Sequence, residues 1–258
     1  MDKLKTYLKH PLSFVLLILI GLASIITVAS IIFIIIYILV NGIPNLTTDL
    51  FSLHYNSKNQ SMLPSIFNTV FITFLTLLIA VPIGIFSAVY LVEYAKKGSK
   101  LVKVIRVTTE TLAGIPSIVF GLFGFLAFVI ALGWGYSMIA GVLTLVMMVL
   151  PTIIRTTEEA LLAVPNSYRE GSFGLGAGKI RTIFKIIVPT AIPGILSGVI
   201  LAIGRIVGET AALIYTSGTV AETATSLTDS ARTLSVHLYC LLSEGLFTNQ
   251  AYATAVIL

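Results

Sequence analysis

Five long apolar runs constrain this chain more than any other feature of its sequence. No Lys, Arg, Asp or Glu occurs between Lys9 and Asp49, and four further runs of membrane length follow. A helix needs about 20 apolar residues to cross the hydrocarbon core, and lipid offers the backbone no hydrogen-bonding partners outside the helix. We therefore predict an all-α, polytopic membrane helical bundle. Its predicted spans are residues 12–40, 66–92, 111–132, 137–154 and 189–216.

Composition supports a membrane protein and excludes several other classes. Only 10% of the residues are charged, whereas a soluble domain carries about 25%. The net charge of +5 does not indicate nucleic-acid binding, because the basic residues lie in short patches beside apolar runs. The single cysteine, Cys240, excludes an intrachain disulfide, and the three histidines lack the spacing of metal ligands. We expect no metal site and no enzymatic chemistry in this chain.

The hydrophilic segments between the runs alternate in their content of Lys and Arg. The N-terminal flank has three of these residues, and segments 94–110 and 155–188 have five each. Segment 41–65 has one, segment 133–136 has none and segment 217–249 has one. Loops rich in Lys and Arg stay in the cytoplasm. This rule predicts that the N-terminus and segment 155–188 are cytoplasmic.

The two ends of the chain give further expectations. The first run is longer than the roughly 7–15 residues of a cleaved signal peptide, so we expect a retained anchor. Residues 1–65 are predicted to form this anchor helix and an outer loop, and residues 66–258 the transmembrane domain. The last eight residues, 251–258, begin another apolar run that is too short to span a membrane. We expect them to be the start of a truncated sixth span.

Small and helix-breaking residues predict how the helices pack and bend. Small residues four apart let helices approach closely, within the bundle or at a dimer face. Breaks are possible where Pro and Gly occur together. Polar residues along one side of the second run are expected to bond across helices, with a lining of the transport pathway as the alternative. The small pairs are Ala80/Gly84, Gly194/Gly198 and Gly204/Gly208; the possible breaks are Pro82–Gly84 and Gly114–Pro116; the polar residues are Asn68, Thr69, Thr73 and Thr76.

A glycine-rich stretch, residues 174–179, resembles a phosphate-binding loop but does not match one. A P-loop has Gly five residues before its Gly-Lys and Ser or Thr directly after it. Here those positions hold Phe173 and Ile180. We therefore expect no ATP site and no cofactor in this chain.

The same stretch fits another pattern. From Glu170 the chain reads Glu-Gly-Ser, three residues, Gly176, nine residues and Ile-Ile-Val-Pro189. It resembles the EAA loop of ABC importer permeases, which has Glu-Ala-Ala, Gly and Ile-x-Leu-Pro at these spacings. This chain departs from that pattern at three positions. Glycines weaken helices by about 1 kcal/mol each, so we expect a short helix, a glycine turn and a second helix leading into the membrane. The resemblance implies that residues 158–189, the EAA segment, dock on a separate ATPase, and its candidate coupling residues are Glu159, Ala160, Glu170, Gly171, Ser172, Gly176, Ile186 and Pro189.

Flanking motifs narrow the resemblance to the phosphate-specific permeases of the PstA family, over about residues 68–215. Those motifs are Pro82-Ile-Gly84, Leu91-Val-Glu-Tyr-Ala95, Gly114-Ile-Pro-Ser-Ile-Val-Phe-Gly121, Glu159-Ala-Leu-Leu-Ala-Val-Pro165, Arg169-Glu170 and Gly204-Arg-Ile-Val-Gly-Glu-Thr-Ala211. The resemblance implies a MetI-like fold, a place in a bacterial or archaeal cytoplasmic membrane, and phosphate as the cargo. It also implies three partners: a second, PstC-like permease, a PstB-like ATPase dimer that binds ATP and Mg, and an external PstS-like phosphate-binding protein.

Alternatives to this interpretation remain open at the level of sequence. The same machine could carry molybdate or sulfate, or the chain could be the sister permease PstC. A secondary transporter or channel would not need an ATPase-docking segment. A membrane scaffold or signalling subunit could coexist with a transport role.

Two charged residues in the last predicted span are candidates for the substrate pathway. Arg205 lies about 24 Å along the helix axis from Pro189, well inside the membrane. A charge at that depth usually faces a bundle interior or a pore. Glu209 follows four residues later and would share one helix face with Arg205, so the two side chains could neutralise each other. We expect Arg205 to offer a guanidinium fork to phosphate, while Glu209 orients Arg205 and keeps the site from binding too tightly. A purely structural ion pair is the alternative.

Overall fold

The computed structural model describes residues 11–96 and 98–258, and within them every regular element is a helix. This confirms the predicted all-α class. The basic N-terminal flank of Lys3, Lys5 and Lys9 lies outside the described residues. The elements, several of them short 3₁₀ or π-helical turns (η), are α2 (Pro11–Gly42), η1 (Ile43–Asn45), η2 (Thr48–Phe51), α3 (Leu63–Val89), η3 (Tyr90–Tyr94), α4 (Lys100–Ala113), α5 (Ser117–Gly124), η4 (Phe125–Ala131), α6 (Met138–Leu162), α7 (Asn166–Gly174), α8 (Lys179–Thr182), η5 (Ile183–Ile187), α9 (Val188–Val207), α10 (Ala211–Thr216), α11 (Leu234–Glu244) and α12 (Thr248–Ile257).

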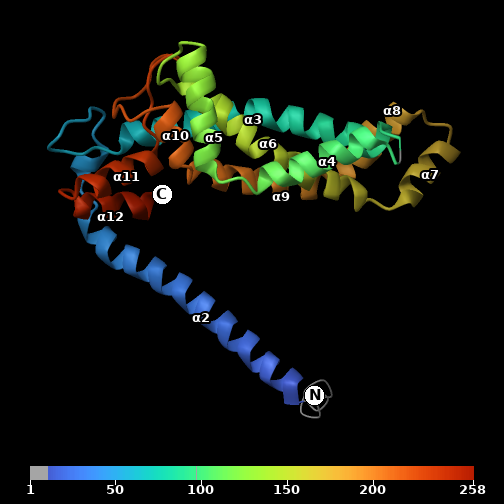
Figure 1. Ribbon diagram of the computed structural model, residues 1–258, viewed down its shortest axis with the longest axis horizontal. Helices are drawn as coiled ribbons and strands as arrows, with labels where there is room; N and C mark the ends of the chain where they lie inside the picture. Colours follow the sequence, from blue (N-terminus) through green and yellow to red (C-terminus); the bar gives the residue numbers. More distant parts are fainter. Residues whose placement is uncertain (1–10, 97) are drawn as a thin grey trace.

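Helix α6 is the centre of the bundle. It packs against α3 and α9, and α4 lies alongside it (Figure 1). In the most apolar 18-residue stretch of α6, 61% of the residues are buried, compared with 28% in the spans that contain α3 and α9. Helix α6 is therefore surrounded by other helices, whereas α3 and α9 expose much of their surface. Leu145, Met148 and Ile153 are fully buried in the main core of the bundle.

Glycines set the close contacts between these helices. A Cβ at Gly84 of α3 would clash with Ile153, and one at Gly194 of α9 would lie 2.6 Å from the Ala160 Cβ. Both distances are shorter than side chains tolerate, so these glycines let α3 and α9 approach α6 closely. Gly204, in contrast, has no neighbouring atom within 4 Å of where a Cβ would lie. Packing within the bundle is therefore confirmed for two of the three predicted small pairs.

The described spans agree with the prediction in number and differ from it in shape. Four continuous helices are long and apolar enough to cross a membrane: Leu12–Asn45, Leu63–Tyr94, Met138–Leu162 and Lys179–Val207. The third predicted run is a pair, Val102–Ala113 and Ser117–Ala131, bent by 101°. The possible break at Gly114–Pro116 is thus confirmed, whereas the one at Pro82 is wrong, because α3 runs on through that proline.

Helix α2 extends away from the bundle (Figure 1). It contacts α12 near its C-terminal end, where the rings of Tyr37 and Tyr252 lie 5.9 Å apart. Gly42 meets the backbone of Tyr252, which explains a small residue at this position. Along most of its length the apolar side chains of α2 are exposed. The final run, residues 251–258, lies in and just after α12, and its continuation into a sixth span stays a prediction.

The end of the bundle that lies opposite the EAA segment is closed by loop 217–233 and α11. The first amides of α6 donate to this loop, Met138 N to Asp229 O at 2.8 Å. Asn68 of α3 donates to the Arg232 carbonyl at 3.1 Å, and Thr69 Oγ1 accepts from Leu234 N at 2.8 Å. Asn68 and Thr69 therefore bond across elements, as the sequence predicted, whereas the hydroxyls of Thr73 and Thr76 have no hydrogen-bond partner among the described residues.

Candidate functional site

Within the EAA segment, α7 and α8 form a helical hairpin at one end of the bundle (Figure 1). Its first helix, α7, has only nine residues, in agreement with the prediction of a short helix. It ends in a Schellman motif, in which Ala177 N donates to Ser172 O at 3.1 Å and Gly176 N to Phe173 O at 2.9 Å. Gly176 has φ +80, a left-handed conformation that favours glycine. The fixed glycine of the motif is therefore the residue that turns the chain from α7 towards α8.

The two arms of the hairpin are joined and lead directly into the membrane. The hydroxyls of Ser172 and Thr182 are hydrogen bonded at 2.8 Å, which ties α7 to α8. From Lys179 the helix continues without a gap through η5 into α9, where Pro189 occupies the first turn. Ile186 packs against the core cluster at this end of the bundle. A displacement of the hairpin would therefore be transmitted along α9.

Glu159 and Ala160 lie apart from the hairpin, in the last turns of α6. Ala160 packs against Gly194 of α9. Glu159 is exposed and pairs with Arg155 at 3.0 Å, and Arg155 reaches Glu110 of α4 at 3.6 Å. This part of the predicted motif therefore joins α4, α6 and α9 and does not belong to the tip.

The tip of the hairpin carries exposed apolar side chains. Leu175 is 91% exposed and Ile180 67% exposed, and Tyr168 and Phe173 are about half exposed. Glu170 and Gly171 are exposed on the same helix, α7. Apolar side chains grouped at the end of a hydrophilic hairpin are typical of a protein–protein contact.

An ion pair that the sequence analysis missed fixes α7 to the bundle. Arg169 Nη2 lies 2.7 Å from Glu93 Oε1, and the two side chains are only 16% and 10% exposed. Arg169 also donates to the carbonyls of Leu161 at 3.1 Å and Val164 at 2.9 Å. Glu93 and Arg169 both lie in quoted motifs, and this was the only sequence signal that could have linked them.

Arg205 and Glu209 are not paired in the described residues. Helix α9 ends at Val207, and Glu209 lies in the break before α10 rather than on the same helix face as Arg205. The Glu209 carboxylate accepts from Ala212 N at 3.0 Å, and its carbonyl accepts from Ser235 Oγ at 2.6 Å. The expected i, i+4 contact is therefore wrong. Glu209 holds the break, and Arg205 is partly exposed beside the open flank of Gly204.

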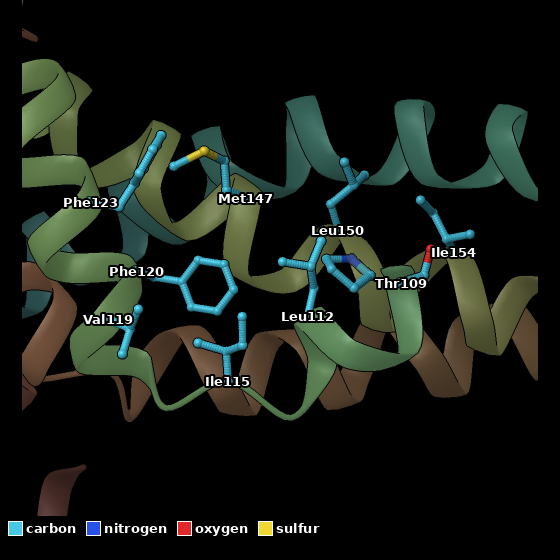
Figure 2. A pocket seen from close by; sticks show the side chains of 10 residues that line it. Thr109, Leu112, Ile115, Val119, Phe120, Phe123, Met147, Leu150 and Ile154 are labelled. Atoms are coloured by element: carbon cyan, nitrogen blue, oxygen red, sulfur yellow. The ribbon is translucent and has the colours of Figure 1, made fainter. Parts of the chain in front are cut away.

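A cavity of about 420 Å³ lies where the broken span bends against α6. Figure 2 shows its lining, in which Leu112, Ile115 and Phe120 approach Met147 and Leu150. Thr109 supplies the only hydroxyl group among the lining side chains, and none of them is charged. Burial of an anion without compensating donors is costly, so this cavity is not a phosphate site.

Comparison with known proteins agrees with the geometry of the hairpin. Residues 80–257 match the family described as binding-protein-dependent transport system inner membrane component. The match covers more than half of the chain. This chain belongs to that family. It is a multi-pass ABC transporter permease, and membrane components of this kind work with a binding protein and an ATPase.

Individual relatives point in the same direction. The probable ABC transporter permease protein YqgI of Bacillus subtilis is 35% identical over 241 residues, 88% of this chain and 82% of the relative. The phosphate transport system permease protein PstA 1 of Mycobacterium tuberculosis is 45% identical over 140 residues, 54% of this chain and 45% of the relative, so less than half of its length is matched. A solved structure of the MetNI methionine ABC transporter in its inward-facing form aligns with a TM-score of 0.53 and 19% sequence identity. The alignment covers 75% of this chain and 83% of the chain in that structure, which confirms the MetI-like fold.

Proposed function

We propose that this chain is the permease subunit of an ATP-driven phosphate importer and forms half of its translocation pathway. The observation that carries the proposal is the EAA segment, folded as an exposed hairpin that continues as one helix into α9. Arg205 lies near the far end of that helix, about 24 Å from Pro189. The names of the PstA relatives support phosphate as the cargo.

The ATPase subunits dock on the tip of the hairpin in this proposal. Leu175, Ile180 and Phe173 supply exposed apolar contacts there. ATP and Mg²⁺ bind to the ATPase, because the glycine-rich turn lacks the residues of a P-loop. The N-terminus and the hairpin lie on the cytoplasmic side, where the Lys and Arg counts favour them. A PstC-like second permease and a PstS-like binding protein complete the assembly.

Arg205 contacts the phosphate in transit, and Glu209 keeps the break between α9 and α10 in place. A guanidinium fork binds a phosphate oxyanion through two hydrogen bonds. The described residues provide no carboxylate partner for Arg205, so its donors stay available for an anion. The open flank at Gly204 gives the anion room beside it.

ATP-dependent uptake of labelled phosphate into vesicles tests the proposal. The vesicles contain this chain and its co-purified partners, and excess molybdate or sulfate serves as competitor. We expect uptake that needs ATP and resists both competitors. Uptake that persists without ATP would reject an ABC importer in favour of a secondary transporter or channel. Uptake abolished by molybdate or sulfate would keep the machine and change its cargo.

Substitution of Arg205 tests its role in the same assay. Arg205→Gln removes both the charge and the fork, so we expect uptake to stop while the complex still assembles. Arg205→Lys keeps the charge without the planar fork, and we expect it to restore only part of the uptake. Loss of the assembled complex in both variants would instead assign Arg205 a structural role.

A further inference from the structure

The short helix η3, which directly follows α3, contacts both helices of the hairpin in the EAA segment. Glu93 Oε1 accepts from Arg169 of α7, at 2.7 Å from Nη2 and 3.0 Å from Nε. The next residue, Tyr94, lies under Lys179 of α8, whose Nζ is 4.6 Å from the ring centroid. Glu93 and Tyr94 therefore hold one arm of the hairpin each, through an ion pair and a cation–π contact.

These contacts are built into the bundle and do not lie loosely on its surface. The Glu93 side chain is 10% exposed and that of Arg169 16% exposed. The remaining donors of Arg169 go to the carbonyls of Leu161 and Val164 and to the Asn166 side chain, at the joint between α6 and α7. A buried carboxylate that loses its only cationic partner leaves an uncompensated charge, so the pair resists opening.

Helix α7 needs such a restraint because both of its connections can bend. Helix α6 ends at Leu162, and three residues lead to α7; the other connection is the left-handed turn at Gly176. The Ser172–Thr182 hydrogen bond restrains α7 from within the hairpin, and a contact with the bundle would restrain it from outside when the tip is pushed. Glu93 and Arg169 are 76 residues apart in sequence, so η3, at the end of α3, supplies that contact from outside the hairpin.

We propose that Glu93 and Tyr94 are positioning residues that make the EAA segment and α3 move as one body during the ATP-driven cycle. The proposal rests on the proposed function, because it assigns a mechanical role within that machine. We call the contacts of Glu93 with Arg169 and of Tyr94 with Lys179 the clamp. With the clamp intact, closure of the ATPase moves α3 together with α6 and α9. Without it, the hairpin swings on its joints and ATP is hydrolysed with little transport.

The test compares Glu93→Gln with wild type in the full complex reconstituted in vesicles. Glutamine has the shape of glutamate without its charge. We expect the ATPase subunits to stay bound and ATP hydrolysis to continue, while phosphate transported per ATP falls about tenfold. Glu110→Gln is the matched control, because Glu110 is 69% exposed and only loosely paired with Arg155; it should keep the wild-type ratio.

A second pair of variants tests the other arm of the clamp. Tyr94→Phe keeps an aromatic ring under Lys179 and should keep the wild-type ratio of phosphate to ATP. Tyr94→Leu removes the ring and should lower that ratio. A wild-type ratio in both Glu93→Gln and Tyr94→Leu would overturn the proposal. So would parallel loss of bound ATPase and uptake with an unchanged ratio, because the contacts would then serve assembly alone.

A cargo-independent measurement separates this proposal from the function on which it rests. Amide hydrogen exchange in residues 166–187 of the full complex should be faster in Glu93→Gln than in wild type or Glu110→Gln. Unchanged exchange in that segment would overturn the clamp. Failure of the wild-type complex to take up phosphate would reject the proposed function alone, since the exchange comparison needs no cargo.

Discussion

At the residue scale, His237 is a buried titratable group held beside a cation. Its side chain has no exposed surface, and its Nδ1 lies 3.3 Å from Arg232 Nη1. Because an arginine can only donate, Nδ1 accepts and the proton of the neutral ring is on Nε2. Burial first, and the Arg232 charge second, lower the pKa of His237 to about 4.

This pKa predicts a loss of stability in acid. An unfolded chain binds a proton at His237 below pH 6.5, whereas the folded chain binds it only near pH 4. The contribution of His237 to the free energy of unfolding is therefore complete above pH 6.5. It falls by about 3 kcal/mol as the pH is lowered from 6.5 to 4. The midpoint of thermal unfolding in detergent, followed across that interval, should fall less in His237→Gln than in wild type. His54→Gln, at an exposed position, should follow wild type, and a full wild-type loss in His237→Gln would contradict the assignment.

Sequence patterns located the charged residues of interest but not their partners. The Leu91-Val-Glu-Tyr-Ala95 motif includes Glu93 but does not indicate its partner, and the side chain is buried against Arg169. No local pattern reports a contact across 76 residues. The Arg205–Glu209 expectation failed for a different reason: it assumed an unbroken helix, and the chain leaves the helix at Gly208. A geometric rule for i, i+4 pairs holds only where the helix itself continues.

At the scale of elements, the contact between α6 and α9 depends on Gly198. A Cβ there would clash with the Thr156 hydroxyl and lie 2.7 Å from the Thr156 Cβ. We expect Gly198→Ala to separate the two helices and to destabilise the isolated chain by about 1–3 kcal/mol. Thermal unfolding in detergent measures the change. Adding Thr156→Ala to this variant should restore part of the loss, since it removes the clashing hydroxyl.

Gly204 provides the matched control on the same helix. A Cβ at Gly204 has open space around it, so no clash is expected in Gly204→Ala. Alanine is a better helix former than glycine by about 1 kcal/mol, and this variant should therefore be as stable as wild type or slightly more stable. Equal destabilisation by Gly198→Ala and Gly204→Ala would show that helix contact does not explain the effect.

The two possible helix breaks show how packing decides what a local signal leaves open. Gly114 and Pro116 flank Ile115, which proline disfavours in a helical conformation, and the span bends there by 101°. Pro82 also lacks a backbone donor, yet α3 passes through it. Two residues later, Gly84 lies tightly against Ile153 of the central helix. The local sequence indicates a break equally strongly at both sites. The difference between them depends on the contact that keeps α3 continuous, which comes from an element 69 residues away.

At the scale of the whole molecule, the bundle has a hairpin at one end and a closed loop cap at the other. The motif spacing and the glycines predicted the hairpin, its turn and its short first helix, because these depend on residues close together in the chain. The Lys and Arg counts predicted only the side of the membrane on which it lies. The position of α2 could not be predicted in this way. Its apolar side chains are exposed along most of its length, so its sequence does not specify which contacts would cover it.

The exposed tip of the hairpin gives the last prediction. Leu175 is 91% exposed at the turn, and an aspartate there would place a charge in the apolar contact proposed for the ATPase. We expect Leu175→Asp to weaken co-purification of the ATPase by about tenfold or more and to reduce phosphate uptake with it. Leu246→Asp is the matched control, because Leu246 is 81% exposed between α11 and α12, the two helices at the opposite end of the bundle. Full ATPase binding in Leu175→Asp would place the docking surface elsewhere, and selective loss in Leu246→Asp would assign the ATPase to the other end of the molecule.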